Sequence, residues 1–550
     1  MIDQQRSRVC EIWRHISKSW RHTRFTRPFL YLCFIGVLAV FSTAKYLRFF
    51  EQAGDAASYV GLVSSAKDNL TFNPYLYSSI LQMNESAWNG VDFWCKSNLE
   101  FFVPSNSSVL QWHAYLIAYP LGILSKISGI SPALIVSIAE AAAIMLALLM
   151  SAKALFKVHR NAVLVGAVLL VVVSSPVLSI GASAQLQPEK LFFLPIVAFF
   201  LFAEKYLNSI KVPPLSVGLV YFFGSLISER SAFTLFWVTF AYFVLRKPKL
   251  FLRPFTNPFL FGAVLSLSWW LIWTLAIENS FFYDNVDLAS ILNGLQRSFT
   301  TDIKTTGKMI VVLLPLILLS ALRWQGLLVG LLSVIPNLAV SVGGAEKTGY
   351  ATHYHAIYIG VLFGTAIIGS LRLLSKIENT TESRKGWNRS VLVGGLTSAF
   401  VLLNLVYSTE SVYNLKNTTT NLSQIRRGFG FYSQSEFDTA LEKRKLALVE
   451  VAGIPIGSKI SAPEWVMPAL IDQGHQMISY YPLGVADADV VFAESSSGEV
   501  SFFPWLMEEQ QSRDIGLCID QVIKNKKVSF DVESFRTGVL RIWFNSGANS

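Results

Sequence analysis

Two carboxylates just past the first hydrophobic segment are the residues of this sequence best placed to do chemistry. The apolar run over residues 29–49 is long enough to cross a bilayer, and Glu51 and Asp55 follow it directly. A carboxylate at this depth lies close to the lipid headgroups and avoids the cost of the hydrocarbon core. An enzyme that acts on a lipid-linked phosphate needs its general base there. The same residues could instead simply cap the next helix and mark the membrane surface.

Further polar groups fall at the ends of predicted helices on the same side of the membrane as Asp55. They are Gln187, Glu189 and Lys190; Glu229 and Arg230; Lys347, His353, Tyr354 and His355; and His113. A base, phosphate-binding cations and imidazoles at one depth could bind a polyprenyl phosphate and activate a hydroxyl group. Each also has a structural explanation. Glu229 and Arg230 could pair at a turn, and the lysines could extend along their helices to the headgroups.

Metal binding and an acidic residue within a span need separate interpretation. His353 and His355 have no Cys or further His at a useful spacing, which argues against a zinc site. The sequence leaves open whether another divalent metal is needed. Glu140 lies among alanines in the middle of a predicted span. Because a buried carboxylate is costly and usually paired, we expect Glu140 to form a hydrogen bond between helices rather than to take part in chemistry.

The composition defines the class of protein. Of the 550 residues, 52% are hydrophobic and only 15% are charged, and the mean hydropathy is +0.44. A soluble domain has roughly 25% charged residues. Long apolar runs recur, which predicts a polytopic α-helical membrane protein. The net charge of +10 does not indicate a nucleic-acid partner, because the basic residues gather at the ends of apolar runs, as topology signals do.

The arrangement of charge along the chain predicts the topology. Residues 1–28 are predicted to form a basic amphipathic segment on the cytoplasmic leaflet. The N-terminus therefore lies on the cytoplasmic side of the cytoplasmic membrane. A long external loop covers residues 50–108, and residues 109–127 form an interfacial or re-entrant helix. About eleven spans are predicted within residues 29–408. The first is the apolar run at 29–49, and the others lie at about 132–154, 161–182, 189–207, 213–228, 231–246, 256–277, 308–322, 325–343, 354–373 and 390–408. An odd number places residues 409–550 outside.

This tail is predicted to be a small α/β domain. Ser435 and Asp438 are expected to cap a helix that ends near residue 451. Residues 478–481 and 490–493 are expected strands, and residues 530–544 a hairpin split at Thr537-Gly538. Cys95 and Cys518 both fall outside the membrane, where they could form a disulfide bond or remain free thiols.

Several short motifs in this order resemble the GT-C superfamily of membrane glycosyltransferases. More closely, the chain is similar to a family of uncharacterised bacterial and archaeal predicted membrane proteins assigned to that superfamily. The likeness is carried by Gly54-Asp55-Ala56-Ala57-Ser58-Tyr59, Gln187-Pro188-Glu189, Ser228-Glu229-Arg230, Ile454-Pro455 through Ala462, Tyr480-Tyr481-Pro482 and Ala488-Asp489-Val490-Val491. That family often has His-Pro and Lys-Glu-Asp at the second and third motifs, so Gln187 and Arg230 depart from it.

The resemblance implies an activity and partners. Asp55 would be the general base that deprotonates an acceptor hydroxyl of a glycan, lipid or protein. The donor would be a polyprenyl-phosphate sugar, transferred with inversion on the external face. The tail domain would help to bind the acceptor or cover the site.

Two other functions remain open. A transporter or flippase of lipid-linked glycans would usually show inverted repeats or interrupted helices, and the sequence has no convincing repeat. In a non-catalytic assembly subunit, Asp55 would be dispensable.

Overall fold

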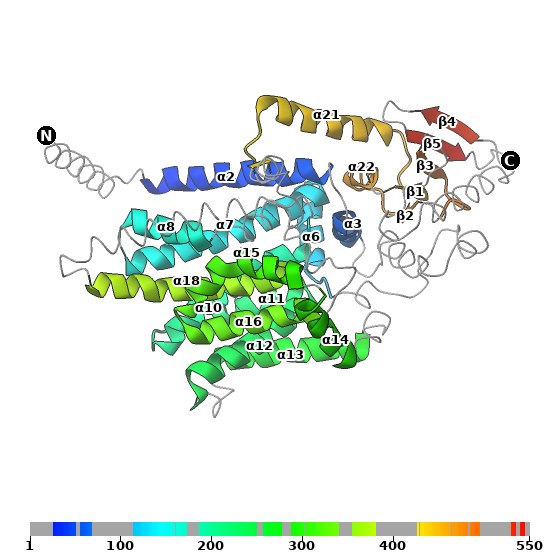
Figure 1. Ribbon diagram of the computed structural model, residues 1–550. Coiled ribbons are helices and arrows are strands. Elements are labelled where there is room, and N and C mark those ends of the chain that lie inside the picture. Colours follow the sequence, from blue (N-terminus) through cyan, green and yellow to red (C-terminus); the bar gives the residue numbers. More distant parts are fainter. Residues whose placement is uncertain are drawn as a thin grey trace.

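The computed structural model describes most of the helical part of the chain and a small C-terminal sheet (Figure 1). The described residues are 26–50, 55–68, 114–159, 161–172, 186–249, 257–277, 288–301, 303–339, 355–380, 426–427, 430–463, 465–481, 484–494, 530–534 and 539–544.

A bundle of apolar helices makes up the larger part of the molecule. Its members are α2 (Thr26–Phe49), α7 (Pro132–Val158), α8 (Ala162–Val172), α10 (Phe193–Leu207), α11 (Pro214–Ile227), α12 (Glu229–Arg246), α13 (Pro258–Ile272), α15 (Ile303–Ala321), α16 (Trp324–Ala339) and α18 (Ala356–Thr380). Several begin as the sequence predicts, because the side chains of Ser131, Ser228 and Asn257 cap the first turns of α7, α12 and α13. Each predicted span that falls on described residues coincides with one of these helices, and the span at 390–408 lies outside them.

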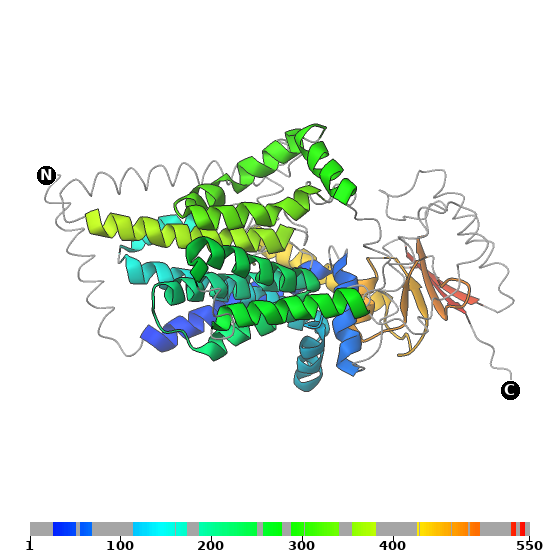
Figure 2. The ribbon, with the colours of Figure 1, turned by 90° about the horizontal axis from the view of Figure 1, so that it is seen from below.

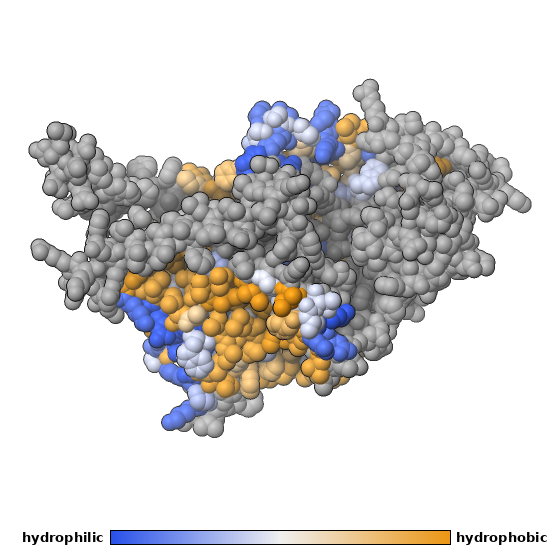
Figure 3. Space-filling model, viewed as in Figure 1, coloured by the Kyte–Doolittle hydropathy of each residue, from blue (hydrophilic) through white to orange (hydrophobic). Residues whose placement is uncertain are grey.

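Helix length and surface character both indicate a membrane protein. Four described helices are long and apolar enough to cross a bilayer: Leu32–Phe49, Pro132–Val158, Pro258–Ala276 and Ala356–Glu378. Large apolar side chains also face outward, among them Phe222 and Phe240, which are 58% and 50% exposed. Figure 3 shows this apolar surface bounded at either end by hydrophilic residues. A surface of this kind is stable against lipid and not against water, so the chain is a helical membrane protein.

Contacts between charged residues define the two ends of the bundle. At one end, Lys45 near the end of α2 reaches Glu140 near the start of α7. At the other, His159 just past α7 lies 3.1 Å from Glu378 near the end of α18. We call the first end the α3 end, after helix α3 (Asp55–Asp68), and the second the Glu204 end, because Glu204 lies in the last turn of α10. Successive helices therefore alternate in direction, so that the starts of α7, α10, α12 and α18 share the α3 end.

Two short helices lie across the α3 end, and Figure 2 shows them crosswise to the bundle. They are α3 (Asp55–Asp68) and α6 (Ala118–Ser128). The two helix backbones approach closely at Gly122 of α6. A Cβ added there would lie 2.7 Å from the backbone nitrogen of Lys67 and 2.8 Å from the carbonyl oxygen of Val63. The 11 residues of α6 extend only about 16 Å, about half the hydrocarbon thickness. This part of the predicted interfacial segment is therefore too short to be a crossing.

The C-terminal sheet lies beyond the α3 end (Figures 1 and 2). Its strands β1 (Ile460–Ala462), β2 (Ile478–Tyr480), β3 (Val490–Glu494), β4 (Phe530–Ser534) and β5 (Val539–Phe544) have the order β2-β1-β3-β5-β4. β1 pairs in parallel with β2 and β3, whereas β5 is antiparallel to both β3 and β4. The predicted hairpin over residues 530–544 is therefore confirmed. Strand β1 was not predicted, because three residues carry too short a pattern.

Helices α21 (Gln434–Glu450) and α22 (Met467–Asp472) connect this sheet to the bundle. The predicted cap of α21 was wrong by two residues. Ser433, not Ser435, forms the cap, because its Oγ accepts from the Glu436 N–H while the Glu436 carboxylate accepts from the Ser433 N–H. Arg444 of α21 and Asp472 of α22 both bond to the Tyr46 hydroxyl of α2, at 2.9 Å each.

Candidate functional site

The carboxylate of Glu140 joins three segments at the α3 end. Its Oε2 accepts a 2.9 Å hydrogen bond from Lys45 Nζ of α2, and its Oε1 accepts a 2.5 Å bond from the Gln187 backbone N–H. Lys190 Nζ lies 3.7 Å from Oε2. The side chains of Lys45, Glu140 and Lys190 are at most 1% exposed. The predicted hydrogen bond between helices is therefore confirmed, and it also holds the turn that carries Gln187 and Lys190.

That turn presents a second carboxylate toward the crosswise helices α3 and α6. Residues Pro188–Phe192 form a short 3-10 helix, η2, that leads into α10. Within it, Glu189 Oε1 accepts a 2.9 Å hydrogen bond from the Tyr115 hydroxyl. The Tyr115 ring packs edge-on against Tyr59 of α3, with 5.8 Å between centroids. Glu189 thereby fixes the segment that leads into α6, and the Tyr115 ring of this segment contacts α3.

Tyr59 stands out on α3 because it is buried and holds its proton. Tyr59 is only 2% exposed, and its hydroxyl has no hydrogen-bond partner among the described residues. Burial raises the pKa of Tyr59 well above its usual value, and the negative charges of Glu140 and Glu189 raise that pKa further. The neutral hydroxyl is therefore a donor close to both carboxylates.

A third carboxylate, at the start of α12, holds the same segment. Glu229 Oε2 accepts a 3.0 Å hydrogen bond from the Ala114 backbone N–H, and the Ile117 N–H donates to the Leu226 carbonyl at 2.7 Å. Arg230 Nε lies 3.8 Å from the other oxygen of Glu229. The pairing of Glu229 with Arg230 that the sequence allowed is thus present. The Arg230 side chain is 42% exposed, so its guanidinium reaches the surface, whereas Lys190 does not.

Of the residues predicted for the site, seven fall within the described part of the chain. Asp55 is the first residue of α3, one helical turn before Tyr59. Gln187, Glu189, Lys190, Glu229 and Arg230 lie together at the α3 end, as the contacts above show. Glu51, His113, Lys347, His353 and Tyr354 lie outside the described residues, as do Cys95 and Cys518. His355 is described; it is buried, directly precedes α18, and its Nδ1 lies 2.6 Å from the Tyr358 hydroxyl.

The sequence interpretation missed Lys45, Tyr59 and Tyr115. Lys45 carried a usable signal, because a lysine inside an apolar span needs a partner there and Glu140 was already identified. The two tyrosines carried none, since aromatic residues are frequent throughout this chain, which has 19 tyrosines and 40 phenylalanines.

The arrangement supplies both acidic and cationic groups at one end of the bundle. Three glutamates hold backbone or hydroxyl donors in place, and Arg230 presents a guanidinium that can bind a phosphate through paired N–H groups. Within the ranges that the structure describes, no three His, Cys, Asp or Glu side chains gather as metal ligands would.

Comparison with known proteins adds no relative to this picture. No protein-family model matches the chain, and no curated protein matches it significantly.

Proposed function

We propose that this chain is a membrane glycosyltransferase that moves a sugar from a polyprenyl-phosphate donor to an acceptor hydroxyl at the external membrane surface. In this proposal about eleven helices cross the cytoplasmic membrane, the α3 end faces outward, and the sheet lies in the extracytoplasmic space. The observed alternation of helix direction is compatible with this topology.

One observation carries the proposal. The carboxylates of Glu189 and Glu229, from turns far apart in the sequence, both hold the segment 114–117, and this segment packs on α3. Helix α3 begins at Asp55, so the backbone of this residue lies at the same end of the apolar bundle as these segments. A lipid-linked substrate could approach this end from the surrounding bilayer with its phosphate at headgroup depth.

Each group has a defined part in the proposed reaction. Asp55 accepts the proton of the acceptor hydroxyl as its oxygen attacks the anomeric carbon of the sugar. The bond from that carbon to the phosphate oxygen breaks, and the polyprenyl phosphate leaves with the electron pair. Arg230 stabilises the charge on the departing phosphate by charge-assisted hydrogen bonds, while buried Lys190 supports the turn through its contact with Glu140.

Replacement of Asp55 tests the proposal against a control on the same helix. Asp55→Asn should lower transfer of a labelled sugar from a polyprenyl-phosphate donor by about 10²-fold or more, because a positioned base contributes about that much. Asp68→Asn, at the other end of α3, should retain activity within about twofold, since its carboxylate is half-exposed and meets Gln476 and Lys126. Activity of Asp55→Asn within about tenfold of the original protein would contradict the base assignment.

The same preparations separate the alternative functions. A flippase reconstituted in vesicles would move a labelled lipid-linked glycan between leaflets without forming a new glycosidic bond. An assembly subunit would do neither, and Asp55→Asn would leave complex formation intact. Either result would reject the transferase proposal.

A further inference from the structure

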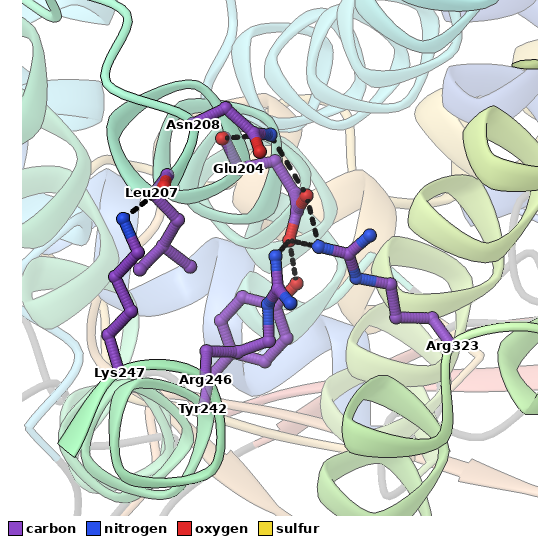
Figure 4. Close-up of polar contacts among 7 residues, drawn as sticks. All are labelled: Glu204, Leu207, Asn208, Tyr242, Arg246, Lys247 and Arg323. Carbon is purple, nitrogen blue, oxygen red and sulfur yellow. Dashed lines mark hydrogen bonds and ion pairs between the residues drawn. The ribbon is translucent and has the colours of Figure 1, made fainter.

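A second polar cluster lies at the Glu204 end of the bundle, away from the candidate site (Figure 4). Arg323, in the turn between α15 and α16, donates through Nη2 to both oxygens of Glu204, at 2.9 and 2.8 Å. Arg246, at the end of α12, places its Nη2 3.4 Å from Glu204 Oε1. The Tyr242 hydroxyl also donates to this oxygen. One carboxylate thus joins the ends of α10 and α12 to the α15–α16 turn.

The cluster has more positive charge than its carboxylate can balance. Two guanidinium groups share Glu204, and both oxygens of Glu204 are already occupied. The Nε atoms of Arg246 and Arg323 are buried and have no acceptor among the described residues. A guanidinium has five N–H donors, and leaving such donors unpaired away from water is costly. Among the described residues the two arginines therefore keep N–H donors that could pair with the oxygens of one anion.

The surroundings of the arginines indicate where that anion comes from. Their side chains are only 20% and 15% exposed, so they reach the surface at the rim of the bundle. Exposed apolar residues flank Arg323 in the chain: Leu322 and Trp324, of which Trp324 is 55% exposed. Tryptophan beside arginine is typical of the membrane–water interface. In the topology predicted from charge, this end faces the cytoplasmic leaflet, which carries anionic lipids.

We propose that Arg246 and Arg323 bind the phosphate of an anionic phospholipid from the cytoplasmic leaflet. The phosphate oxygens accept hydrogen bonds from guanidinium N–H groups that Glu204 leaves unused, and the acyl chains lie along the apolar surface near Trp324. Glu204 orients the two guanidiniums toward the lipid. This site does not depend on the proposed transferase activity.

Lipid retention by the full-length protein tests this site. The protein is exchanged into micelles or nanodiscs that contain equal amounts of phosphatidylglycerol and phosphatidylcholine, and bound lipid is counted by native mass spectrometry. The original protein should retain phosphatidylglycerol preferentially. Arg323→Gln should reduce that preference by about tenfold, which corresponds to the loss of one charge-assisted interaction. Arg323→Lys should reduce it less, because charge remains while the paired geometry is lost.

Arg372→Gln is the matched control. It removes the same charge from an exposed arginine on α18, nearer to the Glu204 end than to the α3 end, but outside the cluster. It should leave the preference unchanged. An equal loss in Arg372→Gln, or no preference in the original protein, would overturn the proposal. Thermal stabilisation by inorganic phosphate that depends on Arg323, without phosphatidylglycerol enrichment, would show a free-phosphate site and also overturn it. If Arg323→Gln fails to fold, Arg323→Lys decides the question.

Discussion

Lys45 and Glu140 form a buried ion pair between α2 and α7, with 2.9 Å between Nζ and Oε2 and at most 1% of either side chain exposed. The pair lies near the α3 end, and the same carboxylate also holds the Gln187 backbone N–H. An isolated charge in this position would be costly, so each residue depends on the other. The pair therefore couples the first helix to the turn that carries the candidate site.

Removal of one partner should destabilise the protein. We expect Lys45→Met to lower the free energy of unfolding by about 3 kcal/mol, because the Glu140 charge is left without its nearest partner. The double variant Lys45→Met, Glu140→Gln should recover only part of this loss, since it removes the Glu140 charge that Lys45→Met leaves without its nearest partner but also takes away the contact of buried Lys190 with Glu140. Unfolding in mixed micelles with increasing denaturing detergent measures both.

Lys126→Met provides the control for this prediction. Its ammonium is 60% exposed and 4.0 Å from Asp68, so its removal should cost no more than about 0.5 kcal/mol. Equal effects of Lys45→Met and Lys126→Met would show that the buried pair contributes nothing specific.

Loss of the Glu229 carboxylate should loosen the segment that enters α6. In Glu229→Ala the buried Ala114 N–H loses its acceptor, which costs about 1–3 kcal/mol. Amide exchange of residues 114–117 should then become at least about tenfold faster, as hydrogen exchange with mass spectrometry can measure. Glu229→Gln keeps an acceptor oxygen and should preserve most of the protection.

Arg230→Ala separates the effect of Glu229 on the segment 114–117 from that of its neighbour Arg230, since both lie in the first turn of α12. Its guanidinium is 42% exposed and only 3.8 Å from Glu229, so its removal should leave exchange of residues 114–117 unchanged. If Arg230→Ala accelerates exchange as much as Glu229→Ala, the turn as a whole and not the carboxylate holds the segment.

Gly122 should be essential for the close packing of α6 on α3. A Cβ at this position would lie 2.7 Å from a backbone nitrogen, which cannot yield as a flexible side chain could. We expect Gly122→Ala to lower the free energy of unfolding by about 1–3 kcal/mol through forced separation of the helices. Gly218→Ala, where a Cβ meets nothing within 4 Å, should instead be neutral or stabilise α11 by up to about 1 kcal/mol. The same detergent unfolding assay compares the two.

The sequence predicts the helices better than it predicts their partners. Apolar runs are local signals, so the predicted spans at 132–154 and 231–246 coincide with α7 and α12, whose first turns Ser131 and Ser228 cap. A carboxylate at Glu140 signals that some partner exists, but the choice of Lys45, 95 residues away in sequence, depends on how α2 packs against α7. Strand β1 depends likewise on non-local pairing with β2 and β3.

The candidate site shows the same division. Helix-end positions placed Glu189 and Glu229 at one depth, which follows from the alternation of spans. That both would hold the segment 114–117 could not be predicted, because Tyr115 and the Ala114 N–H carry no distinctive pattern. The cap of α21 shows how two nearby serines are distinguished. Glu436 stands three residues after Ser433 and closes the capping box, whereas Ser435 has Asp438 at that position.

His475 should make the stability of the tail domain depend on pH. It lies in the segment that connects α22 to β2, the residue is 2% exposed, and neither ring nitrogen has a partner among the described residues. Burial lowers the pKa of His475 below its ordinary 6.5. Below that pH the unfolded chain takes up a proton that the folded domain does not, so stability falls as the pH falls through 6.5, by at most about 1.4 kcal/mol per pH unit. Above it both states are neutral and the effect disappears.

Glu436 titrates in a separate pH range. Arg426 and the Ser433 cap lower the pKa of Glu436 to about 2, so its contribution to stability is lost only below its ordinary pKa of 4.5. Hydrogen exchange of residues 467–480 in the full-length protein, compared at pH 7.5 and pH 5.5 with intrinsic rates corrected, should show lower protection at the acid pH, and His475→Phe should abolish this difference. If His475→Phe retains the full pH dependence, another group is responsible.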